Sequence, residues 1–529
     1  MNLKERLNGV LQPFIGPDVD IRWSVPKHTA QGDLSTNAAM IVAKRAGKNP
    51  RELAQQIVDA INLDEFGLEK AEVAGPGFVN VWIGPRYYQN IVRQILEQGD
   101  GYGSSDAGEG QRVLVEFVSA NPTGPLNIVS ARAAAIGDSL VRLLRKAGYT
   151  AMAEFYVNDA GRQIRRLGMS VIARALGEEV PEDGYHGEDV VELAKKVYVE
   201  RTPSADDDPD EIGKLAADFN VTRQQTVLGN YRVEFDRWFR ESELHSGGDP
   251  ERALEALIAA GAVYEKDGAT WFKGSDFGDE EDRVIITSEG RPTYLLPDIA
   301  YHLNKAQRAD TAIDLLGPDH HDYVNRMQAA LKALGHENFL NVLIVQQVHL
   351  LREGERVKMS KRAGKLIQLS DLLDEVGVDV ARYFFLQRKT SSPLEFDLDL
   401  ALEQSEQNPV YYIQYAHTRI RGILRQEGAP VPSSKSPLDP LTAPEELELI
   451  KHLEQFSVAI ERAAEAHEPQ RLVGYLEELA NRFHKFYTAC HVIGEEEAVS
   501  KARAALVEAA GIVLKEGLHL LGVEAPERM

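Results

Sequence analysis

The chain has 529 residues, 43% of them hydrophobic and 27% charged, a composition typical of a soluble globular protein with three or four domains. Its formal net charge of -23 argues against nonspecific binding of nucleic acid over the whole surface and leaves room only for a local basic face. One cysteine, Cys490, excludes an internal disulfide and a cysteine-based zinc site. Because there is neither a signal-peptide core nor an apolar run of membrane-spanning length, we expect a cytoplasmic protein with no membrane partner.

Residues 1–108 are expected to form a separate unit that mixes helices and strands. A helix is predicted to begin at Pro50, since proline is favoured in the first helical turn, and two short strands are predicted within 71–82. These strands flank Gly75-Pro76-Gly77. A phosphate loop would need a helix directly after it and a full set of N–H groups, so this tripeptide indicates a tight turn. The glycine-rich run 99–110 is the predicted linker.

The stretch from 113 to 148 is the most informative part of the chain. Its apolar, β-branched start at 113–118 predicts a buried strand. The turn-forming cluster Asn121–Pro125 follows, and helical periodicity then runs from Ile128 to a stop at Gly148. A strand, a turn and a helix N-terminus together favour a phosphate site, because unpaired N–H groups and the helix dipole attract an anion. An ordinary strand–turn–helix without a ligand is the alternative that this stretch alone leaves open.

The next segments predict the remainder of an α/β fold. A second strand is predicted at 154–157 with polar residues after it, at the sheet edge where ligands bind. The helical, charged region at about 170–262 is predicted as one insertion between two halves of the fold. Short strands are then predicted at 263–264, 269–272, 282–287, 293–296, 314–321 and 342–345. Because His320 and His321 would share a strand and point to opposite faces, we expect no metal ion between them.

A basic segment follows at 358–365. It holds three lysines and one arginine with serine and glycine between them. Such a loop suits a polyphosphate whose negative charge grows as it leaves. A solvated basic turn is the alternative.

The last 130 residues are predicted to be helical. Apolar side chains recur there at helical spacing, and a proline- and serine-rich connector spans 428–444. Tyr411, Tyr415 and Arg419 alternate aromatic and basic groups, which could stack on unpaired RNA bases. A stripe of this kind is also common in protein cores.

These segments carry a resemblance to a known family. Lys358-Met359-Ser360-Lys361 matches the second signature of class I aminoacyl-tRNA synthetases, and Ala120–Leu126 matches the arginine-specific segment before the first signature. Tyr156–Gly161, Tyr185–Glu188 and Asn408–Tyr412 also look like family segments. Over essentially its whole length, the chain resembles the arginyl-tRNA synthetases.

The resemblance implies an α/β fold in three parts. Residues 1–108 would form an N-terminal α+β domain that contacts the tRNA elbow, and 109–400 a Rossmann-like catalytic domain with an insertion. Residues 401–529 would form an all-α anticodon-binding bundle. The implied reaction joins L-arginine to tRNA(Arg) through an arginyl-adenylate, with ATP and Mg²⁺ as the substrate complex and no tightly bound metal. We expect a monomer in which tRNA binds before arginine is activated.

The implied arginine pocket follows from the chemistry of the substrate. Arginine presents a planar fork of donors that carboxylates hold best. By resemblance, the pocket contains Glu116, Asn121, Tyr294 and Asp298, with His320 and His321 at its rim. A carboxylate among apolar neighbours is costly unless it is paired, so we expect Glu116 to have a partner. A surface carboxylate at a strand edge is the alternative.

The implied ATP site departs from the family at the first signature. Where the family has His-x-Gly-His, this chain has Asn127-Ile128-Val129-Ser130. Asparagine and serine donate hydrogen bonds but carry no positive charge. The ATP contacts expected from the resemblance are Pro122, Thr123, Gly124, Pro125, Asn127, Ser130, Met359, Ser360 and Lys361. The catalytic set would be Lys358, Lys361, Ser130 and Asn127.

Two hypotheses follow from this departure. The first is an active ligase that uses neutral donors, the helix N-terminus and the intact lysine loop. The second is a degenerate paralogue that binds tRNA or arginine without catalysis. The intact three-part plan and the intact second signature favour the ligase. Another class I synthetase or a stand-alone tRNA-binding protein is a more distant alternative.

Overall fold

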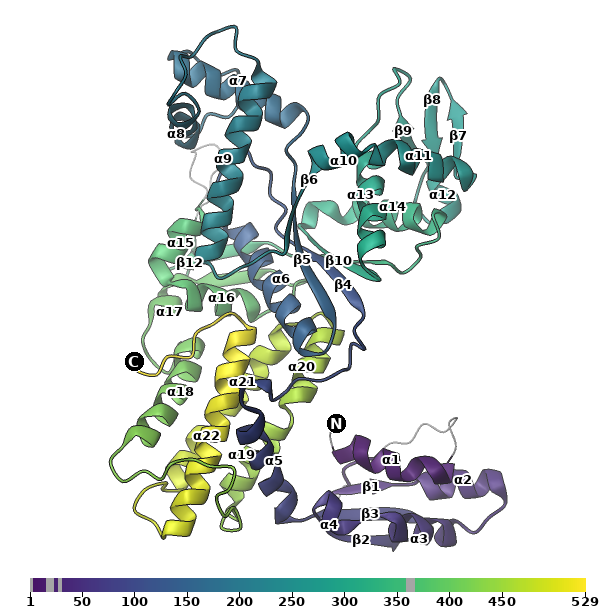
Figure 1. The fold of residues 1–529 in the computed structure, drawn as a ribbon, viewed down its shortest axis with the longest axis vertical. Helices are drawn as coiled ribbons and strands as arrows, with labels where there is room; N and C mark the ends of the chain where they lie inside the picture. The colour runs from purple at the N-terminus through teal and green to yellow at the C-terminus, as the bar shows by residue number, and fades with distance from the viewer. Residues whose placement is uncertain (1–2, 16–22, 27–30, 358–366) are drawn as a thin grey trace.

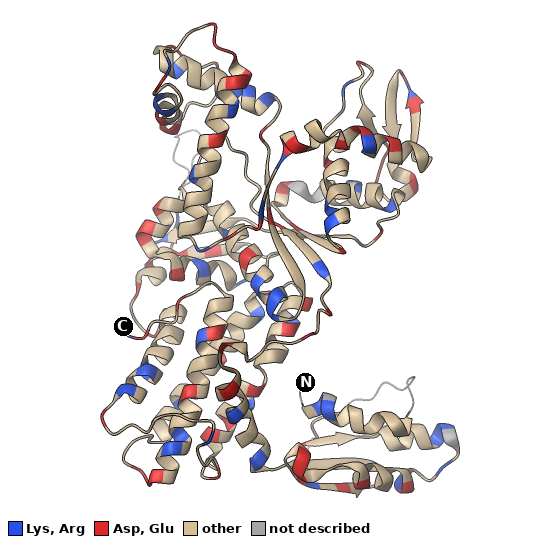
Figure 2. Cartoon of the chain, viewed as in Figure 1, with Lys and Arg blue, Asp and Glu red and all other residues tan. Residues whose placement is uncertain are grey.

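A computed structural model describes residues 3–15, 23–26, 31–357 and 367–529. The chain forms an N-terminal α+β domain, a central α/β region with two projections, and a C-terminal helical bundle (Figure 1). Acidic and basic residues are interspersed along all three parts of the chain (Figure 2). None of the helices in the described ranges is long and apolar enough to cross a membrane.

The N-terminal domain has one antiparallel sheet covered by short helices. Its strand order is β1-β3-β2, and β2 (Leu68–Ala74) and β3 (Phe78–Ile83) join through the tight turn predicted at Gly75–Gly77. The other elements are β1 (Leu34–Thr36), α1 (Leu3–Ile15), α2 (Ala38–Ala46), α3 (Pro50–Ala60) and α4 (Leu63–Phe66). The next helix, α5 (Pro85–Gln98), packs instead on the C-terminal helices α19 (Pro444–Glu454) and α22 (Glu497–Leu520).

The central region contains a five-stranded parallel sheet in the order β11-β10-β4-β5-β6. The strands are β4 (Arg112–Glu116), β5 (Thr150–Val157), β6 (Arg237–Arg240), β10 (Thr311–Leu316) and β11 (Leu340–Ile344). The predicted strand–turn–helix is confirmed, with α6 (Ile128–Lys146) as its helix. β4 ends two residues earlier than predicted, because the backbone of Val118 and Ser119 has φ values of 70° and 40°, outside the strand region.

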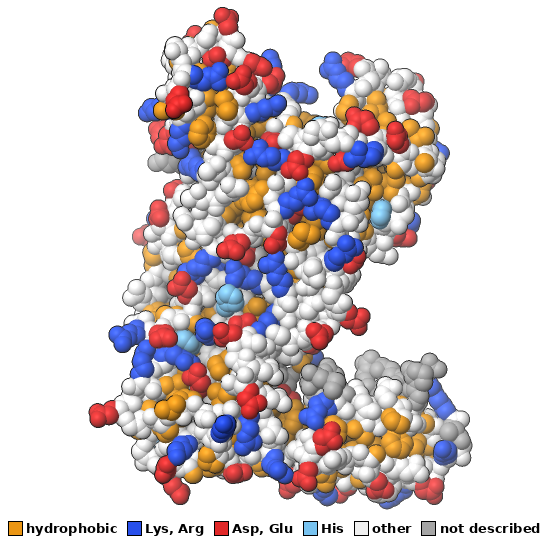
Figure 3. Space-filling view, viewed as in Figure 1, with side chains coloured by type: hydrophobic (Ala, Val, Ile, Leu, Met, Phe, Trp, Pro, Cys, Tyr) orange, Lys and Arg blue, Asp and Glu red, His pale blue; other side chains and the backbone are white. Residues whose placement is uncertain are grey.

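The insertion predicted at 170–262 is two insertions, and the prediction of one block is wrong. The first, named the arm, contains α7 (Arg162–Leu176), α8 (Glu188–Val197) and α9 (Pro209–Asn230). The chain then returns to the sheet as β6, a four-residue strand too short to recognise from periodicity. The second insertion, named the lobe, spans 241–308. Figure 3 shows a notch between the arm and the lobe.

The lobe is an antiparallel sheet with helices around it. Its strand order is β7-β8-β9, formed by β7 (Val263–Lys266), β8 (Ala269–Phe272) and β9 (Arg283–Ile286). Its helices are α10 (Glu241–Gly247), α11 (Asp249–Ala259), α12 (Gly274–Phe277) and α13 (Leu295–Arg308). Helices α11, α12 and α13 share one hydrophobic core with α14 (His321–Ala333), whereas Leu244 of α10 packs in a separate cluster with Phe239 and Tyr301.

Two glycines let the helices of the arm cross closely. A Cβ atom at Gly168 of α7 would lie 1.9 Å from the carbonyl oxygen of Pro209. A Cβ atom at Gly213 of α9 would lie 2.1 Å from the carbonyl oxygen of Ile164. Because real Cβ atoms do not approach backbone oxygens so closely, both positions require glycine.

Two strand predictions in the second half of the chain are wrong. The segment 293–296 starts α13, since a four-residue apolar run does not separate a strand from a buried helix. β10 ends at Leu316, before Gly317-Pro318, so His320 lies in a 3-10 turn and His321 starts α14. The argument about two histidines on one strand therefore does not apply.

The C-terminal part contains a small sheet followed by the bundle. The sheet has the order β13-β12-β14, formed by β12 (Val348–Arg352), β13 (Glu355–Arg356) and β14 (Leu394–Asp397). Helices α15 (Leu369–Val376), α16 (Val378–Leu386) and α17 (Leu398–Leu402) accompany it. The predicted helical bundle contains α18 (Pro409–Arg425), α19, α20 (Phe456–Glu465), α21 (Gln470–Ala489) and α22.

Candidate active site

Three carboxylates lie side by side at the carboxyl edge of the main sheet. Strand register places Asp314 of β10 next to Glu116 of β4, and Glu116 next to Glu154 of β5. Neighbouring register positions point to the same face of a sheet. The three residues are 2%, 7% and 0% exposed. Buried carboxylates need cationic or hydrogen-bonding partners, so this acidic row must be neutralised from a facing element.

Lys305 of α13 neutralises one half of the acidic row. Its Nζ lies 2.5 Å from Oε2 of Glu116 and 2.6 Å from Oδ1 of Asp314. Burial alone would lower the pKa of Lys305, but the two carboxylates outweigh it and raise that pKa. Nε2 of His302 lies 2.9 Å from the other oxygen of Asp314. Lysine and histidine together hold the pKa of Asp314 below its usual value, although burial acts in the opposite direction.

Arg308, one turn further along α13, neutralises the other half. Its guanidinium donates two hydrogen bonds, of 2.6 and 2.9 Å, to the two oxygens of Glu154. The hydroxyl of Tyr301 donates a third, 2.8 Å long, to the same carboxylate. Tyr301, Lys305 and Arg308 are spaced four and three residues apart and so lie on one helical face. This face of α13 is therefore fixed over the carboxyl edge of the sheet.

The expected partner of Glu116 thus exists within the protein. Besides Lys305, the hydroxyl of Ser119 donates a 2.7 Å hydrogen bond to Oε1 of Glu116. The backbone conformation of Val118 and Ser119 places this hydroxyl beneath the carboxylate that ends β4. Both oxygens of Glu116 are engaged, so it supplies negative charge to the site without offering a free bidentate face.

Asp298 has a different environment from Glu116. It lies in the first turn of α13 and is half-buried. Burial raises the pKa of Asp298 to about 7, and the negative charges of Glu241 and Glu116 add to this effect, whereas His302 and Arg326 oppose it. A carboxylate whose surroundings disfavour its negative charge is suited to bind a cation, because the positive charge of the cation stabilises the ionised carboxylate.

Glu241 is a site residue that the sequence analysis missed. It starts α10, and its side chain is 13% exposed. The hydroxyl of Tyr156 is hydrogen-bonded to it, and the amide nitrogen of Asn158, in the orientation that satisfies its neighbours, donates to Oε2 at 2.9 Å. Tyr156 and Asn158 lie at the end of β5 and directly after it, in the family-like segment 156–161. Nothing in the local pattern around Glu241 distinguishes it from a surface acid.

The first-signature segment caps α6. Oδ1 of Asn127 accepts hydrogen bonds from the backbone N–H groups of Val129 (2.9 Å) and Ser130 (3.1 Å). The asparagine therefore occupies N–H groups that the sequence analysis expected to be free for an anion. Its amide nitrogen is directed by the same geometry away from the cap. Ser130 is half-buried in the first turn of α6.

The second signature lies outside the described residues, and so do its members Lys358, Met359, Ser360 and Lys361. The chain directly after it is attached to the first signature. The N–H of Leu369 donates to the carbonyl of Leu126 at 2.9 Å, and Gln368 forms a backbone bridge with Asn127. The chain at Gln368 and Leu369 is therefore held against the start of α6.

The remaining predicted residues lie around this edge of the sheet or in the bundle. Asn121 is exposed, and the turn residues Pro122, Thr123, Gly124 and Pro125 are buried or half-buried. Tyr294 precedes the first turn of α13 and is 75% exposed, so no pocket encloses it in this conformation. His320 and His321 are placed in the backbone only, at the start of α14.

The predicted RNA-contacting residues gather on α18. The guanidinium of Arg419 lies 5.0 Å from the ring centre of Tyr415 and 5.1 Å from that of Tyr487 of α21. The ring of Tyr411 stacks on that of Tyr415 at 6.4 Å. The group is partly exposed, so it offers aromatic and cationic surface at the side of the bundle.

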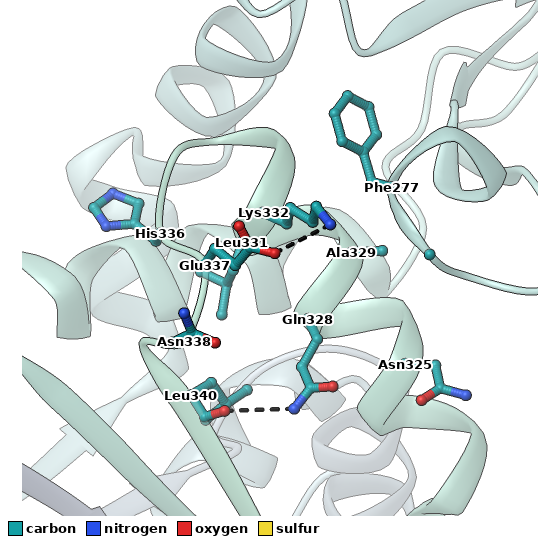
Figure 4. A pocket seen from close by; sticks show the side chains of 11 residues that line it. Phe277, Asn325, Gln328, Ala329, Leu331, Lys332, His336, Glu337, Asn338 and Leu340 are labelled. Atoms are coloured by element: carbon teal, nitrogen blue, oxygen red, sulfur yellow. Dashed lines mark hydrogen bonds and ion pairs between the residues drawn. The ribbon is translucent and has the colours of Figure 1, made fainter.

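A cavity of about 260 Å³ lies elsewhere, between α12 and α14. Figure 4 shows Gln328 donating to the carbonyl of Leu340 and Lys332 paired with Glu337 across its wall. None of the predicted site residues lines it. In the described ranges, no group of three or more histidine, cysteine, aspartate or glutamate side chains is arranged to hold a metal ion.

A parallel α/β sheet with a strand–turn–helix at its carboxyl edge is typical of nucleotide-dependent enzymes. Residues 91–391 match the catalytic domain model "tRNA synthetases class I (R)". The fold also resembles that of a methionyl-tRNA synthetase from Mycobacterium tuberculosis, with a TM-score of 0.55 and 13% identity over 78% of this chain and 90% of that one. The central region is thus a class I aminoacyl-tRNA synthetase catalytic domain.

The flanking domains narrow the assignment. Residues 1–83 match the arginyl-tRNA synthetase N-terminal domain, and 413–529 match the DALR anticodon binding domain. The chain is similar to proteins named arginine–tRNA ligase from Shouchella clausii (46% identity over 520 residues; 95% of this chain, 93% of the relative) and Bacillus subtilis (43% over 560 residues; 100% of both). A Thermus thermophilus arginyl-tRNA synthetase shares the fold, with a TM-score of 0.76 and 22% identity over 100% and 99% of the two chains. The chain belongs to the arginyl-tRNA synthetase family.

Proposed function

We propose that this chain is an arginine–tRNA ligase. It activates L-arginine with ATP and transfers the arginyl group to the 3′ end of tRNA(Arg). The observation that carries the proposal is the environment of Asp298 in the first turn of α13, where burial and the charges of Glu241 and Glu116 raise its pKa to about 7. In this proposal the guanidinium of arginine lies at Asp298 and its carboxylate is directed toward the turn before α6. End-to-end similarity to proteins named arginine–tRNA ligase supports the same conclusion.

The reaction needs no protein nucleophile. In the first step, an oxygen of the arginine carboxylate attacks the α-phosphorus of ATP, and the bond to the β-phosphate breaks with release of pyrophosphate. In the second step, a ribose hydroxyl of the tRNA terminus attacks the arginyl carbonyl, and AMP leaves. The protein contributes position and electrostatic stabilisation. Mg²⁺ enters with the triphosphate of ATP and lowers its charge.

Arginine recognition is assigned to the face where α10 and α13 meet. Asp298 binds the guanidinium, because its charged form is the one that a cation stabilises. Tyr294 and Asn121 close over the substrate from the exposed rim. Glu116 acts from beneath, through its charge and through Lys305. His320 and His321 complete the rim at the start of α14.

ATP recognition is assigned to the turn before α6 and to the lysine loop. The amide of Asn127 and the hydroxyl of Ser130 donate to the triphosphate in place of the family's histidines. The turn Pro122–Pro125 forms one wall. Lys358 and Lys361 stabilise the departing pyrophosphate, and Met359 and Ser360 contact the nucleotide.

The tRNA is bound at two sites on the remaining domains. Tyr411, Tyr415 and Arg419 stack on unpaired anticodon bases, since an arginine held between aromatic rings presents a flat cationic surface. The N-terminal domain contacts the tRNA elbow. The working form is a monomer in the cytoplasm.

ATP–pyrophosphate exchange with arginine and tRNA tests the proposal. We expect exchange that requires arginine and is not supported by lysine or methionine. Exchange at background level, together with retained binding of tRNA, would instead identify the chain as a degenerate paralogue. Exchange with another amino acid would assign it to a different specificity.

A further inference from the structure

Helix α9 of the arm holds the turn that precedes α6. Nδ2 of Asn220 donates to the carbonyl oxygen of Pro122 at 2.9 Å. Nε2 of Gln224, one turn along α9, donates to the carbonyl oxygens of Asn121 (3.2 Å) and Gly124 (3.3 Å). Both amide side chains belong to residues that are only 1% exposed. Two buried amides of the arm therefore fix three carbonyls of the turn.

This arrangement determines where the turn can donate. A trans peptide is planar, so the N–H of a residue points opposite to the carbonyl that precedes it. With the carbonyl of Pro122 turned toward Asn220, the N–H of Thr123 points away from α9. The corresponding positions after Asn121 and Gly124 are prolines without an N–H. Thr123 thus holds the one directed backbone donor among these three peptide units.

The same helix also contacts the segment after the second signature. Nη2 of Arg223 donates to Oε1 of Gln368 at 3.2 Å, and Gln368 forms the backbone bridge with Asn127. Within about one helical turn, α9 thus contacts both the turn before α6 and Gln368. Polar side chains of the arm are therefore hydrogen-bonded to segments at the carboxyl edge of the sheet.

We infer that Asn220 and Gln224 are positioning residues for adenylate formation. They hold the turn 121–125 so that the N–H of Thr123 and the amide of Asn127 face the phosphates of ATP. The inference rests on the proposed function, since it needs ATP at this turn. The support of the turn by Asn220 and Gln224 matters more here than in a chain with histidines at the first signature. Neutral donors carry no net charge, so their stabilising effect depends more strongly on their placement.

The test uses isosteric variants that remove the donors and keep the shape. Asn220→Asp and Gln224→Glu place a carboxylate oxygen where each amide nitrogen donates. For Asn220→Asp we expect ATP affinity, measured by calorimetry, to fall about tenfold, and KM for ATP in exchange to rise by a similar factor. KM for arginine should stay within twofold, because Asn220 contacts only the Pro122 carbonyl. For Gln224→Glu both KM values should rise, since it also holds Asn121.

The matched control is Thr226→Ala on the exposed face of α9, whose hydroxyl bonds only to the carbonyl of Thr222. It should leave both KM values unchanged. If the parent protein catalyses exchange and both acid variants bind ATP as it does, the inference is overturned while the ligase assignment stands. If the parent protein shows no exchange, the ligase assignment fails, and calorimetry with ATP alone still decides the role of Asn220. If one of the two acid variants does not fold, the comparison is made with the remaining acid variant.

Discussion

Lys305 and Glu116, 189 positions apart in sequence, are joined by a contact of 2.5 Å in the interior of the protein. The lysine has no exposed surface. It completes a row of buried acids that the register of three parallel strands brings together. The charge of the proposed arginine pocket is therefore set by buried groups such as Lys305 as well as by the residues proposed to face the substrate.

Replacing Lys305 by methionine should strongly destabilise the protein. It would leave Glu116 and Asp314 buried at adjacent strand positions without their shared cation. Loss of one partner from a buried ion pair costs about 3–5 kcal/mol. Urea unfolding should show this decrease. Lys332→Met, which breaks a largely exposed pair with Glu337, is the control and should change the free energy of unfolding by less than about 1 kcal/mol.

Arginine binding should depend on the ionisation of Asp298. Because the pKa of Asp298 is raised to about 7, a falling pH protonates it and removes the charge that holds the guanidinium. We expect kcat/KM for arginine to fall tenfold per pH unit well below pH 7, with a midpoint near 7 in the free enzyme. A flat profile between pH 6 and 8 would contradict this role.

The variant Asp298→Asn should separate function from stability. A carboxyl whose pKa is higher in the folded than in the unfolded state binds protons better when folded, so its negative charge opposes folding. This destabilisation grows between about pH 4 and pH 7 and stays constant above pH 7. Removing that charge should raise KM for arginine at least about 100-fold. The free energy of unfolding at pH 8 should stay the same or increase. A decrease would indicate that a structural partner of Asp298 had been lost.

Asn127 should show two separable roles. Asn127→Ala removes the cap of α6 and should cost about 1 kcal/mol of stability, together with ATP affinity. Asn127→Asp keeps an oxygen for the cap but places a negative charge beside the phosphates. Its thermal stability should match that of the parent, while KM for ATP rises by more than tenfold. Equal KM values for the aspartate variant and the parent would show that the asparagine acts only as a cap.

Lys361 should be essential for the chemical step. Lys361→Ala removes a positive charge where pyrophosphate leaves, and we expect kcat for exchange to fall by about two to three orders of magnitude. Lys365→Ala, in the same basic segment but outside the signature, should have a much smaller effect. An unchanged kcat for Lys361→Ala would remove this residue from the reaction.

Local patterns predicted the elements with strong periodicity. The strand–turn–helix around Asn121 and the helices of the bundle could be read from apolar spacing and from turn residues. Short elements could not, because β6 and the start of α13 each offer only a few apolar residues. The same limit hid the second insertion, which is defined by the return of β6 to the sheet.

Site residues within or beside sequence motifs could be predicted. Site residues whose roles depend on tertiary contacts could not. Glu116 and Asp298 stand out next to recognisable segments. Lys305, Arg308 and Glu241 do not, since their roles arise from the crossing of α13 and α10 over strands far away in sequence. The capping role of Asn127 was also missed, although asparagine before a helix is a common cap.

The packing of α5 against α19 and α22 has a practical consequence for dissecting this protein. Apolar side chains of α5, among them Ile91, Val92 and Ile95, are buried, and Tyr102 after it donates to the carbonyl of Leu453. A shortened polypeptide that starts at β4 would lack α5, and the apolar surfaces of α19 and α22 that α5 covers would be exposed to water. A cut made before Pro85 would remove only the outlying N-terminal module and should yield a fragment that remains monodisperse.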